Sequence, residues 1–553
     1  MKKALVIIFF LILITVPTVL PFFSTKFFYT QDHIFVARLQ QMSSALLSGQ
    51  FPVRWAPDLR YGEPLFNFYA PLPYYLGAII NLSGLDFIWV AKTLFILSSI
   101  LSAATMYILC RKLFDSKAAF LAAFLYIYAP YRAVDIYVRG ALSESFAFIF
   151  FPLIFYSSVL LSEKRDLSRI CLLALSLAGL FLTHSITTLM FMPFLVFFWI
   201  YLIFEKKARR LIFLFLGSLA LGSGVSAFFL LPAMVERQFI QTQYLIVGYF
   251  DFRAHFVAFF QLFSTYWGYG SSLWGLDDGL SFQIGSVHWV ILALALVLGL
   301  FLIKNRYKSV ANKKSLFFLI FLGVSFFISI FLQHNKSAFI WEAISLMAFI
   351  QFPWRFLAIS IFFVAIIGGA VASYFQNKYK LIYFILIIAV VVVNLGYFKP
   401  KEYVKESFFD KFLNVEIMQK GVDLTKDYLP IWVATTDGDK FDSPRTQSGS
   451  AEFSNLKQSS ATFEFMADVA SDSLIEVPIT YFPGWEVRAN GQLVNQEKPS
   501  EMGLIRFTLP KGNYSIDIEF KNTPIRTVGN TISIFSILTV LVLFSLRKKY
   551  KNA

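Results

Sequence analysis

The chain has 553 residues, of which 57% are hydrophobic and only 15% are charged. This composition excludes a soluble globular protein, in which about 25% of residues are charged. The formal net charge of +15 would suit nucleic acid, but Lys and Arg stand in short clusters at the ends of apolar runs, so we expect no nucleic-acid partner. The two cysteines, Cys110 and Cys171, support neither a disulfide framework nor a thiolate metal site.

Apolar runs long enough to cross a hydrocarbon core of about 30 Å recur along the whole chain. The sequence therefore predicts an all-α polytopic membrane protein with the lipid bilayer as a constant partner. We predict twelve spans, at residues 4–22, 87–109, 117–131, 143–161, 167–183, 185–204, 211–231, 286–303, 315–333, 355–374, 381–397 and 525–546.

Basic clusters at the span ends set the predicted topology. With twelve crossings and both termini inside, every cluster falls on one face, as the positive-inside rule requires. We therefore expect a plasma-membrane protein with cytoplasmic termini. The clusters are Lys2-Lys3, Arg111 with Lys112 and Lys117, Lys164 with Arg165 and Arg169, Lys206 to Arg210, Lys304 to Lys314, Lys378 with Lys380, and Arg547 to Lys551.

Four polar regions fall on the predicted outer face. In the first, apolar side chains recur at helical spacing from Phe35 to Leu46, which predicts an amphipathic helix lying flat on the membrane surface. Residues 72–84 are too short to cross the bilayer, and we interpret them as a partly inserted helix. The four regions are residues 24–73, 131–140, 232–285 and 398–524.

The apolar period changes from helical to two near residues 460–521. Alternating runs such as ATFEFMAD and GLIRFTL are separated by the turn signals Asn490-Gly491 and Lys511-Gly512. This pattern predicts a small antiparallel β-sandwich on the extracytoplasmic side. We divide the chain into a transmembrane domain (1–397), a β domain (398–524), and a last transmembrane helix with a basic tail (525–553).

Two outer positions carry groups suited to proton chemistry. Asp32 stands at the start of a predicted helix, where an aspartate often caps free N–H groups. The other interpretation is a general base at the mouth of a cavity that excludes water. His184 lies at the outer end of a span, where a polar ring needs a partner because unsatisfied groups are costly in lipid.

Charged residues also gather where spans meet the outer face. Arg132, Asp135, Arg139 and Glu144 cluster in YRAVDIYVRGALSE. They either pair among themselves or leave one arginine facing an anion. Arg355 precedes a span, so it either snorkels to the interface or clamps a phosphate with its planar fork of donors.

The remaining acids are weaker signals. Asp277 and Asp278 offer oxygen ligands of the kind that divalent cations bind. Glu236 and Arg237 are interpreted as solvated loop charges. No P-loop, dinucleotide fingerprint, zincin helix or nucleophile elbow occurs in the sequence.

Several stretches, taken in order, resemble one family. They are QDHIFVARLQQMSSALLSGQFPVRWAPDLRYGEPLFNFYAPLPYYL, RGALSESFAFIFFPLIFY, LTHSITTLMFMPFL, IQFPWRFLAISIF and YFPGWEVRANGQ. The chain resembles the membrane proteins labelled 6-pyruvoyl-tetrahydropterin synthase-related, which are similar to the GT-C superfamily of polytopic glycosyltransferases. The pterin label implies nothing about chemistry, because the sequence shows neither a soluble pterin-binding fold nor a histidine zinc triad.

The resemblance implies a GT-C-like enzyme that moves a hexosyl or pentosyl group from a polyprenyl-phosphate donor to a glycan or protein acceptor of the cell envelope. In that superfamily an acid of the first outer loop acts as base or metal ligand, and Asp32 occupies that position. Many members carry an acidic pair there, whereas here His33 follows. The sequence thus requires no cofactor, although a divalent cation (Mg²⁺ or Mn²⁺) is compatible, with Asp32, Asp277 and Asp278 as candidate ligands.

Inverting sugar transfer needs a carboxylate to take the acceptor proton and positive groups to stabilise the departing phosphate. Aromatic faces would hold sugar rings, although an interfacial aromatic belt also explains such residues. The candidates are Asp32 as the catalytic base; Arg355, Arg139 and Arg132 for the donor phosphate; His33, His184 and Glu144 in support; and Trp55, Tyr61 and Tyr69 for sugar stacking.

Two other classes of function remain open from the sequence. A lipid-linked carrier or flippase usually buries ionisable groups near the membrane midplane and often contains inverted repeats. The spans here have almost no central charge, and no repeat is visible. A non-catalytic envelope protein would display the β domain, but twelve spans and a long first loop exceed what display needs.

Overall fold

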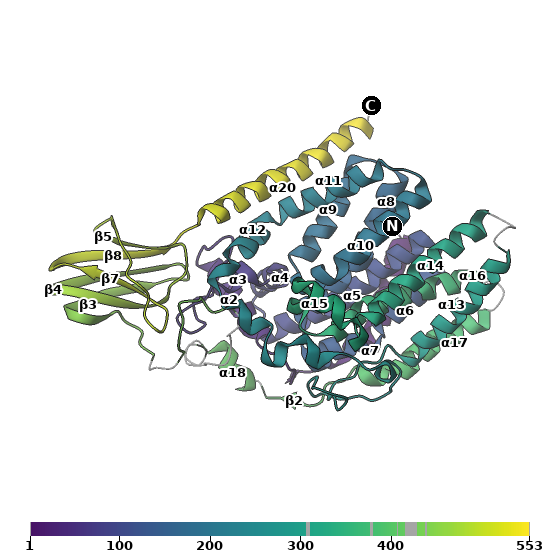
Figure 1. Cartoon of the computed structure of the whole chain (residues 1–553), viewed down its shortest axis with the longest axis horizontal. Helices are drawn as coiled ribbons and strands as arrows, with labels where there is room; N and C mark the ends of the chain where they lie inside the picture. The colour runs from purple at the N-terminus through teal and green to yellow at the C-terminus, as the bar shows by residue number, and fades with distance from the viewer. Residues whose placement is uncertain are drawn as a thin grey trace.

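The structure is a computed structural model that describes residues 2–305, 310–375, 380–405, 407–414, 418, 428–436 and 440–551. Long helices form a bundle at one end of the molecule and an antiparallel sheet forms the other, and α20 (Pro524–Lys551) runs from the sheet back along the bundle (Figure 1). Two predictions fall partly outside the described residues. The predicted basic clusters include residues 306–309 and 378, which are not described. The predicted β domain includes residues 406, 415–417, 419–427 and 437–439, which are not described either.

The polytopic helical class is confirmed. In the described part of the chain, nine helical segments are long and apolar enough to cross a membrane. They correspond to α1 (Lys2–Val19), α5 (Phe87–Leu113), α8 (Leu142–Glu163), α10 (Ser185–Lys206), α13 (Ser286–Asn305), α14 (Val310–Phe331), α16 (Leu357–Phe375), α17 (Lys380–Asn394) and α20.

Two further predicted spans are bent. α6 (Ser116–Ile127) is followed after a 48° bend by α7 (Pro130–Ala133) and the π-helix η2 (Val134–Arg139), and α11 (Leu211–Val225) meets α12 (Ala227–Val235) at 80°. The span predicted over 211–231 is therefore interrupted by a sharp bend between α11 and α12. The bend follows the small-residue run LGSGVS, and such glycine–serine pairs are a common cause of sharp kinks.

The one remaining predicted span, residues 167–183, corresponds to α9 (Leu167–Phe181), which has 15 residues. At 1.5 Å per residue it extends roughly 22 Å, which is less than the hydrocarbon core. α9 packs against α8 and α11 inside the bundle. The described chain thus contains nine to eleven spans that meet the length criterion, and the twelve-crossing topology needs α9 to cross as well.

The first outer loop folds into the protein. α2 (Phe35–Leu47) packs against α4 (Leu72–Asn81) and α5 on one side and α18 (Ser407–Leu413) on another. Its polar residues Arg38 and Gln41 are buried, and Gln41 Nε2 donates to Asp58 Oδ2 at 2.9 Å. The prediction that this helix lies flat on the membrane surface is therefore wrong, because protein covers both of its faces.

Short elements complete the face of the bundle that lies toward the β domain. β1 (Phe27–Phe28) pairs antiparallel with β2 (Tyr403–Val404) and ties the first loop to the segment before the β domain. The other short elements are η1 (Leu20–Phe23), α3 (Leu65–Phe68), η3 (Glu236–Phe239), η4 (Thr242–Leu245), η5 (Gly248–Phe250), η6 (Phe252–His255), η7 (Phe259–Leu262), η8 (Asn335–Ser337), α15 (Ala338–Ala343), η9 (Ser345–Ile350), η10 (Pro353–Phe356) and η11 (Leu395–Tyr397).

The predicted antiparallel β domain is confirmed, and its strands form one sheet rather than two. β4 pairs with β3, with β8 along its first half and with β7 along its second half, in the order β3-β4-β8-β5-β6. Asn490 (φ 50°) and Gly491 (φ 81°) form the predicted hairpin turn. The strands are β3 (Arg445–Gln458), β4 (Thr462–Thr480), β5 (Trp485–Ala489), β6 (Gln492–Val494), β7 (Leu504–Leu509) and β8 (Gly512–Phe520).

Candidate functional site

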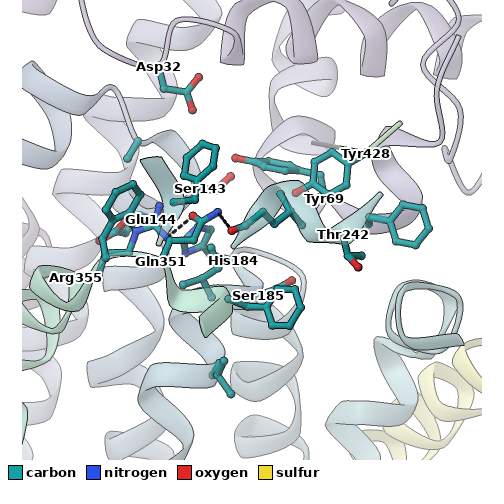
Figure 2. A pocket seen from close by; sticks show the side chains of 18 of the residues that line it. Asp32, Tyr69, Ser143, Glu144, His184, Ser185, Thr242, Gln351, Arg355 and Tyr428 are labelled. Carbon is teal, nitrogen blue, oxygen red and sulfur yellow. Dashed lines mark hydrogen bonds and ion pairs between the residues drawn. The ribbon is translucent and has the colours of Figure 1, made fainter. Parts of the chain in front are cut away.

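A cavity of about 660 Å³ lies where the first outer loop, the end of η2, the start of α10, the loop after α12 and the segment before α16 meet. Figure 2 shows Asp32 at one edge of this cavity and Glu144, His184 and Arg355 grouped on another wall. The lining residues come from segments 31–38, 68–69, 139–144, 184–189, 229–250 and 346–355, together with Ser272 and Tyr428.

Backbone pairing holds Asp32 at the cavity. The N–H groups of Gln31 and Asp32 donate to the carbonyl oxygens of Val138 and Arg139 at 2.9 and 2.8 Å. The Asp32 side chain is 43% exposed, and its Oδ2 lies 3.5 Å from Nη1 of Arg38. The helix-cap interpretation of Asp32 is not supported, because no side chain caps the N-terminus of α2. A partly exposed carboxylate therefore lies in the cavity wall beside a buried cation.

Arg139 is neutralised by two buried acids. Its Nη1 donates to Asp135 Oδ1 at 2.7 Å and to Glu144 Oε2 at 2.8 Å. Tyr131 donates its hydroxyl proton to Glu144 Oε1 at 2.6 Å, and Ser145 donates to Asp135 Oδ2 at 3.0 Å. Of the two interpretations of this cluster, mutual pairing is the one observed. Arg139 and Glu144 both line the cavity, but as a paired unit.

Arg132 does not reach the cavity, which corrects its predicted place among the phosphate-facing arginines. It is buried, and its guanidinium lies 4.2 Å from the centroid of the Phe148 ring. Its Nη1 donates to the Ser145 carbonyl at 3.3 Å. The π-helical turn η2 is the cause, because it carries Arg139 to the cavity wall and leaves Arg132 facing the helix bundle.

Arg355 is a wall cation that shares the carboxylate of Glu144 with Arg139. Its Nε lies 3.9 Å from Glu144 Oε2 and has no hydrogen-bond partner among the described residues. Its Nη1 donates to the Ile350 carbonyl at 2.8 Å and to Gln351 Oε1 at 3.2 Å. The side chain is 11% exposed and lines the cavity, so it does not snorkel to the lipid interface.

The backbone beside Arg355 is strained. Gln351 has φ 67° and ψ −46°, a conformation that non-glycine residues rarely adopt. Its Nε2 donates to the Leu245 carbonyl at 2.8 Å, which joins the segment before α16 to the loop after α12. Strain of this kind persists only where the surroundings enforce it, and it concentrates at functional sites. Gln351 therefore positions Arg355 at the junction of two cavity walls.

His184 presents a neutral imidazole to the cavity. Its Nδ1 accepts a hydrogen bond from the backbone N–H of Thr187 at 3.3 Å and so caps α10. Because Nδ1 is an acceptor, the neutral ring carries its hydrogen on Nε2. Burial lowers the pKa of His184 to about 3, the carboxylate of Glu144 opposes this shift, and Arg355 reinforces it. His184 is thus a hydrogen-bond donor rather than a cation.

Two arginines without a predicted role also line the cavity. Arg38 is buried against Tyr69, with its guanidinium 4.3 Å from the ring centroid. The sequence signal for Arg38 is its place beside the apolar stripe of α2, three residues after Phe35 and four before Met42. Arg237, two residues after the end of α12, is exposed as a solvated charge should be, and it also lines the cavity.

The neighbour of Arg237 has a different environment. Glu236 is buried, and its Oε2 lies 3.0 Å from Nη2 of Arg526 at the start of α20. The prediction that Glu236 is a solvated loop charge is therefore wrong. The cause is the docking of α20 against α12, which brings a distant arginine to this acid.

The cavity lining carries an excess of positive charge. Four arginines and two carboxylates line it, and Asp135, which does not line it, pairs with Arg139, so the formal charge of the whole group is +1. Arg38 is paired with Asp32, and Arg139 with Glu144. Among the described residues, no carboxylate lies closer than 3.9 Å to either of the other two arginines, at positions 237 and 355. The cavity is therefore suited to an anion, since an unbalanced guanidinium favours a phosphate or carboxylate.

Other predicted residues lie away from this cavity. The His33 ring lies against Phe412, with ring centroids 4.6 Å apart. Trp55 is buried and meets Trp485 of the β domain edge-on, so it offers no face to a sugar. The Tyr61 hydroxyl accepts the backbone N–H of residue 441 at 3.1 Å. The first loop packs against the β domain, which is why Trp55 and Tyr61 fill the junction. Of the three predicted stacking residues, Tyr69 lines the cavity.

The two loop acids do not join Asp32. Asp277 and Asp278 line a separate groove. Asp278 accepts hydrogen bonds from Gln261 Nε2 at 2.9 Å and from Ser272 Oγ at 3.1 Å, which holds its own loop together. Within the described ranges, no group of three or more His, Cys, Asp or Glu side chains is placed to hold a metal ion.

The fold defines a polytopic helical membrane protein with a C-terminal antiparallel β domain. Residues 66–400, more than half of the chain, match the family described as "6-pyruvoyl-tetrahydropterin synthase related domain; membrane protein". The chain belongs to this family. It is 27% identical over 236 residues to an uncharacterized protein of Lactococcus lactis subsp. cremoris (strain MG1363), a match that covers 40% of this chain and 38% of that protein.

Two solved structures of the Archaeoglobus fulgidus oligosaccharyltransferase are also similar. The apo form is 14% identical with a TM-score of 0.44, and the match covers 73% of this chain and 57% of that chain. The form tethered to an acceptor peptide containing the NVT sequon is 13% identical with a TM-score of 0.45, and the match covers 77% and 60%. Both TM-scores lie below 0.5, so this likeness carries no conclusion about activity.

Proposed function

We propose that this protein is a glycosyltransferase that moves a sugar from a polyprenyl-phosphate donor to a cell-envelope acceptor on the outer side of the plasma membrane. The observation that carries the proposal is the convergence of Asp32, Arg237 and Arg355, from three distant segments, on one cavity. Another part of the wall is apolar and suits an isoprenoid chain. Its apolar residues include Ile186, Leu189, Phe229, Leu230, Met234 and Phe349.

The proposed step follows from these groups. An acceptor hydroxyl oxygen attacks the anomeric carbon, the bond from that carbon to the phosphate oxygen breaks, and its electron pair leaves with the polyprenyl phosphate. Asp32 takes the proton of the hydroxyl. The phosphate changes from a diester of charge −1 to a monoester that approaches −2. A wall with an excess of positive charge therefore stabilises the departing phosphate more than the bound donor, which lowers the barrier.

The direct test is sugar transfer in isolated membranes. Membranes containing the protein are incubated with radiolabelled sugars linked to polyprenyl phosphate, and label in glycan or protein is measured. We expect transfer from at least one such donor. Movement of the intact labelled lipid across proteoliposomes, with no new glycosidic bond, would instead indicate a carrier.

Arg355 gives the first prediction from this proposal. Arg355→Gln removes the wall cation whose carboxylate partner, Glu144, lies closer to Arg139, so we expect transfer to fall by about 100-fold. Binding of polyprenyl phosphate should weaken as well, measured by equilibrium binding in detergent. Arg253→Gln is the matched control, because Arg253 is half exposed, pairs with Asp251 and Glu342, and lies outside the cavity. Equal losses in the two variants would contradict the role of Arg355.

Gly140 gives the second prediction, because it allows the first loop to approach η2. Gly140 has φ 69°, and a Cβ there would stand 2.6 Å from the Asp32 carbonyl oxygen. Gly140→Ala should displace Asp32 and lower transfer by about 10- to 100-fold, since a misplacement of about 1 Å can cost that much. Gly84→Ala is the control, because Gly84 has φ 86° but open space around it. If Gly84→Ala lost as much activity as Gly140→Ala, backbone strain alone would explain the loss, and the clash with Asp32 would not be needed.

Three parts of the proposal need their own measurements. Transfer before and after EDTA, and after Mg²⁺ or Mn²⁺ is added back, decides whether a divalent cation joins Asp32. Mass spectrometry of envelope glycans and proteins, with and without the protein, identifies the acceptor. Labelling of single cysteines from either side of intact cells tests the proposed topology, with cytoplasmic termini and an extracytoplasmic β domain.

A further inference from the structure

A second cavity, of about 300 Å³, lies at the opposite ends of the helices that carry the candidate site. α8 carries Glu144 in its first turn and ends at Glu163, and α10 begins beside His184 and ends at Lys206. Each has 22 residues, which at 1.5 Å per residue extend roughly 33 Å, about the thickness of a hydrocarbon core. The two cavities therefore open toward opposite faces of the membrane, and the proposed function makes no use of the second.

The rim of this second cavity is charged. Lys112 Nζ lies 2.6 Å from Glu163 Oε2, at the ends of α5 and α8. Glu205 accepts from both Lys206, at 2.9 Å, and Lys314, at 3.1 Å. The lysine side chains are 32%, 33% and 58% exposed, so they remain accessible to a ligand. Three lysines against two glutamates leave a formal charge of +1 on the cavity lining.

The body of this cavity is apolar. Leu298 and Leu302 of α13, Phe198 of α10 and Leu319 of α14 line it, and Tyr201 and Tyr374 stand among them. Such a surface would be left without contacts if only water or an inorganic ion bound at the rim. A ligand that satisfies both parts must be amphipathic, with an anionic head and an apolar tail.

We propose that this cavity binds an anionic phospholipid, with the phosphodiester at the lysine rim and an acyl chain against the apolar wall. A headgroup of net charge −1 balances the rim charge of +1, whereas a zwitterionic headgroup leaves it unbalanced. All three lysines belong to the basic clusters predicted to lie on the cytoplasmic face, where anionic lipids attract such residues.

The test is native mass spectrometry of the delipidated full chain in detergent, titrated with palmitoyl-oleoyl phosphatidylglycerol, phosphatidylcholine or inorganic phosphate. We expect phosphatidylglycerol to bind at least about tenfold more tightly than phosphatidylcholine. The double variant K112Q/K314Q should weaken that binding by at least about fivefold. The temperature of thermal unfolding should rise with added phosphatidylglycerol, because a ligand of the folded state stabilises it.

Two further variants separate the site from general effects. K164Q/R209Q removes the same charge from two exposed residues of basic clusters on the same predicted face. Neither residue lines the cavity, so this variant should bind as the native chain does. Ala370→Phe fills the cavity and keeps every charge, so it should weaken binding too. Three results would overturn the proposal. K164Q/R209Q could weaken phosphatidylglycerol binding as much as K112Q/K314Q does, or Ala370→Phe could bind phosphatidylglycerol as tightly as the native chain. Inorganic phosphate alone could raise the unfolding temperature as much as phosphatidylglycerol does.

Discussion

Replacing Asp32 with asparagine is expected to lower sugar transfer by at least about 100-fold, the usual contribution of a positioned general base. The amide keeps the shape of the side chain but cannot take the acceptor proton. The backbone pairing of Asp32 with Arg139 does not involve the side chain, so the fold should persist. Binding of polyprenyl phosphate should change little, because Arg237 and Arg355 remain in place. We therefore expect Asp32→Asn to lower the rate of transfer and to leave donor affinity nearly unchanged.

The measurement compares initial rates of transfer at saturating donor with donor affinity in the same preparation. Asp468→Asn is the control, because this exposed carboxylate on β4 lies in the β domain away from the cavity. Transfer by Asp32→Asn at the native rate removes Asp32 from the mechanism. A fall in donor affinity as large as the fall in rate would instead assign Asp32 to binding.

Replacing Glu236 with glutamine is expected to destabilise the protein by about 3–5 kcal/mol, because it leaves the buried Arg526 guanidinium without its counter-charge. Glu236 Oε2 accepts from Asn67 Nδ2 at 2.7 Å and from Arg526 Nε at 3.0 Å, and Oε1 accepts from Thr523 Oγ1 at 2.5 Å. Arg526 is 0% exposed. This network joins the first loop, the end of α12 and the start of α20, so its loss should loosen the junction with the β domain.

Thermal unfolding in detergent measures this effect, followed by tryptophan fluorescence. The double variant E236M/R526M is the informative comparison, because replacing both members of a buried ion pair with apolar residues is often neutral. We expect it to be more stable than E236Q. Equal destabilisation in the single and double variants would show that hydrogen bonds to Asn67 and Thr523, and not the ion pair, hold the junction.

Local chemistry was enough to predict the class of the protein. Whether a segment enters a membrane depends on its own hydropathy and length, because backbone polar groups in lipid must be satisfied within the helix. The β domain followed from apolar alternation in β4, β7 and β8. Apolar alternation does not identify every strand of the domain. Most residues of β3 are exposed, so its sequence does not alternate between apolar and polar residues.

The site was predicted in part for a similar reason. Four of the predicted site residues stand beside apolar runs: Asp32, Glu144, His184 and Arg355. Placing a charged or polar group close to the hydrocarbon core costs solvation energy, so such groups are often functional. Which arginine faces the cavity was not predictable. Arg132 and Arg139 lie in the same cluster, and the π-helical turn between them decides that Arg139 reaches the wall.

Burial, pairing and cavity position depend on neighbours that are distant in the chain. Trp55 faces Trp485 across the domain junction, and Glu236 meets Arg526. No local pattern records these contacts, because each depends on how the helices pack and where the β domain docks. The amino-acid order specified a polytopic helical protein with a C-terminal β domain and several polar residues that could serve a cavity. Tertiary packing selected which of those residues face a ligand, because it determines which charges are neutralised by a partner and which are left free.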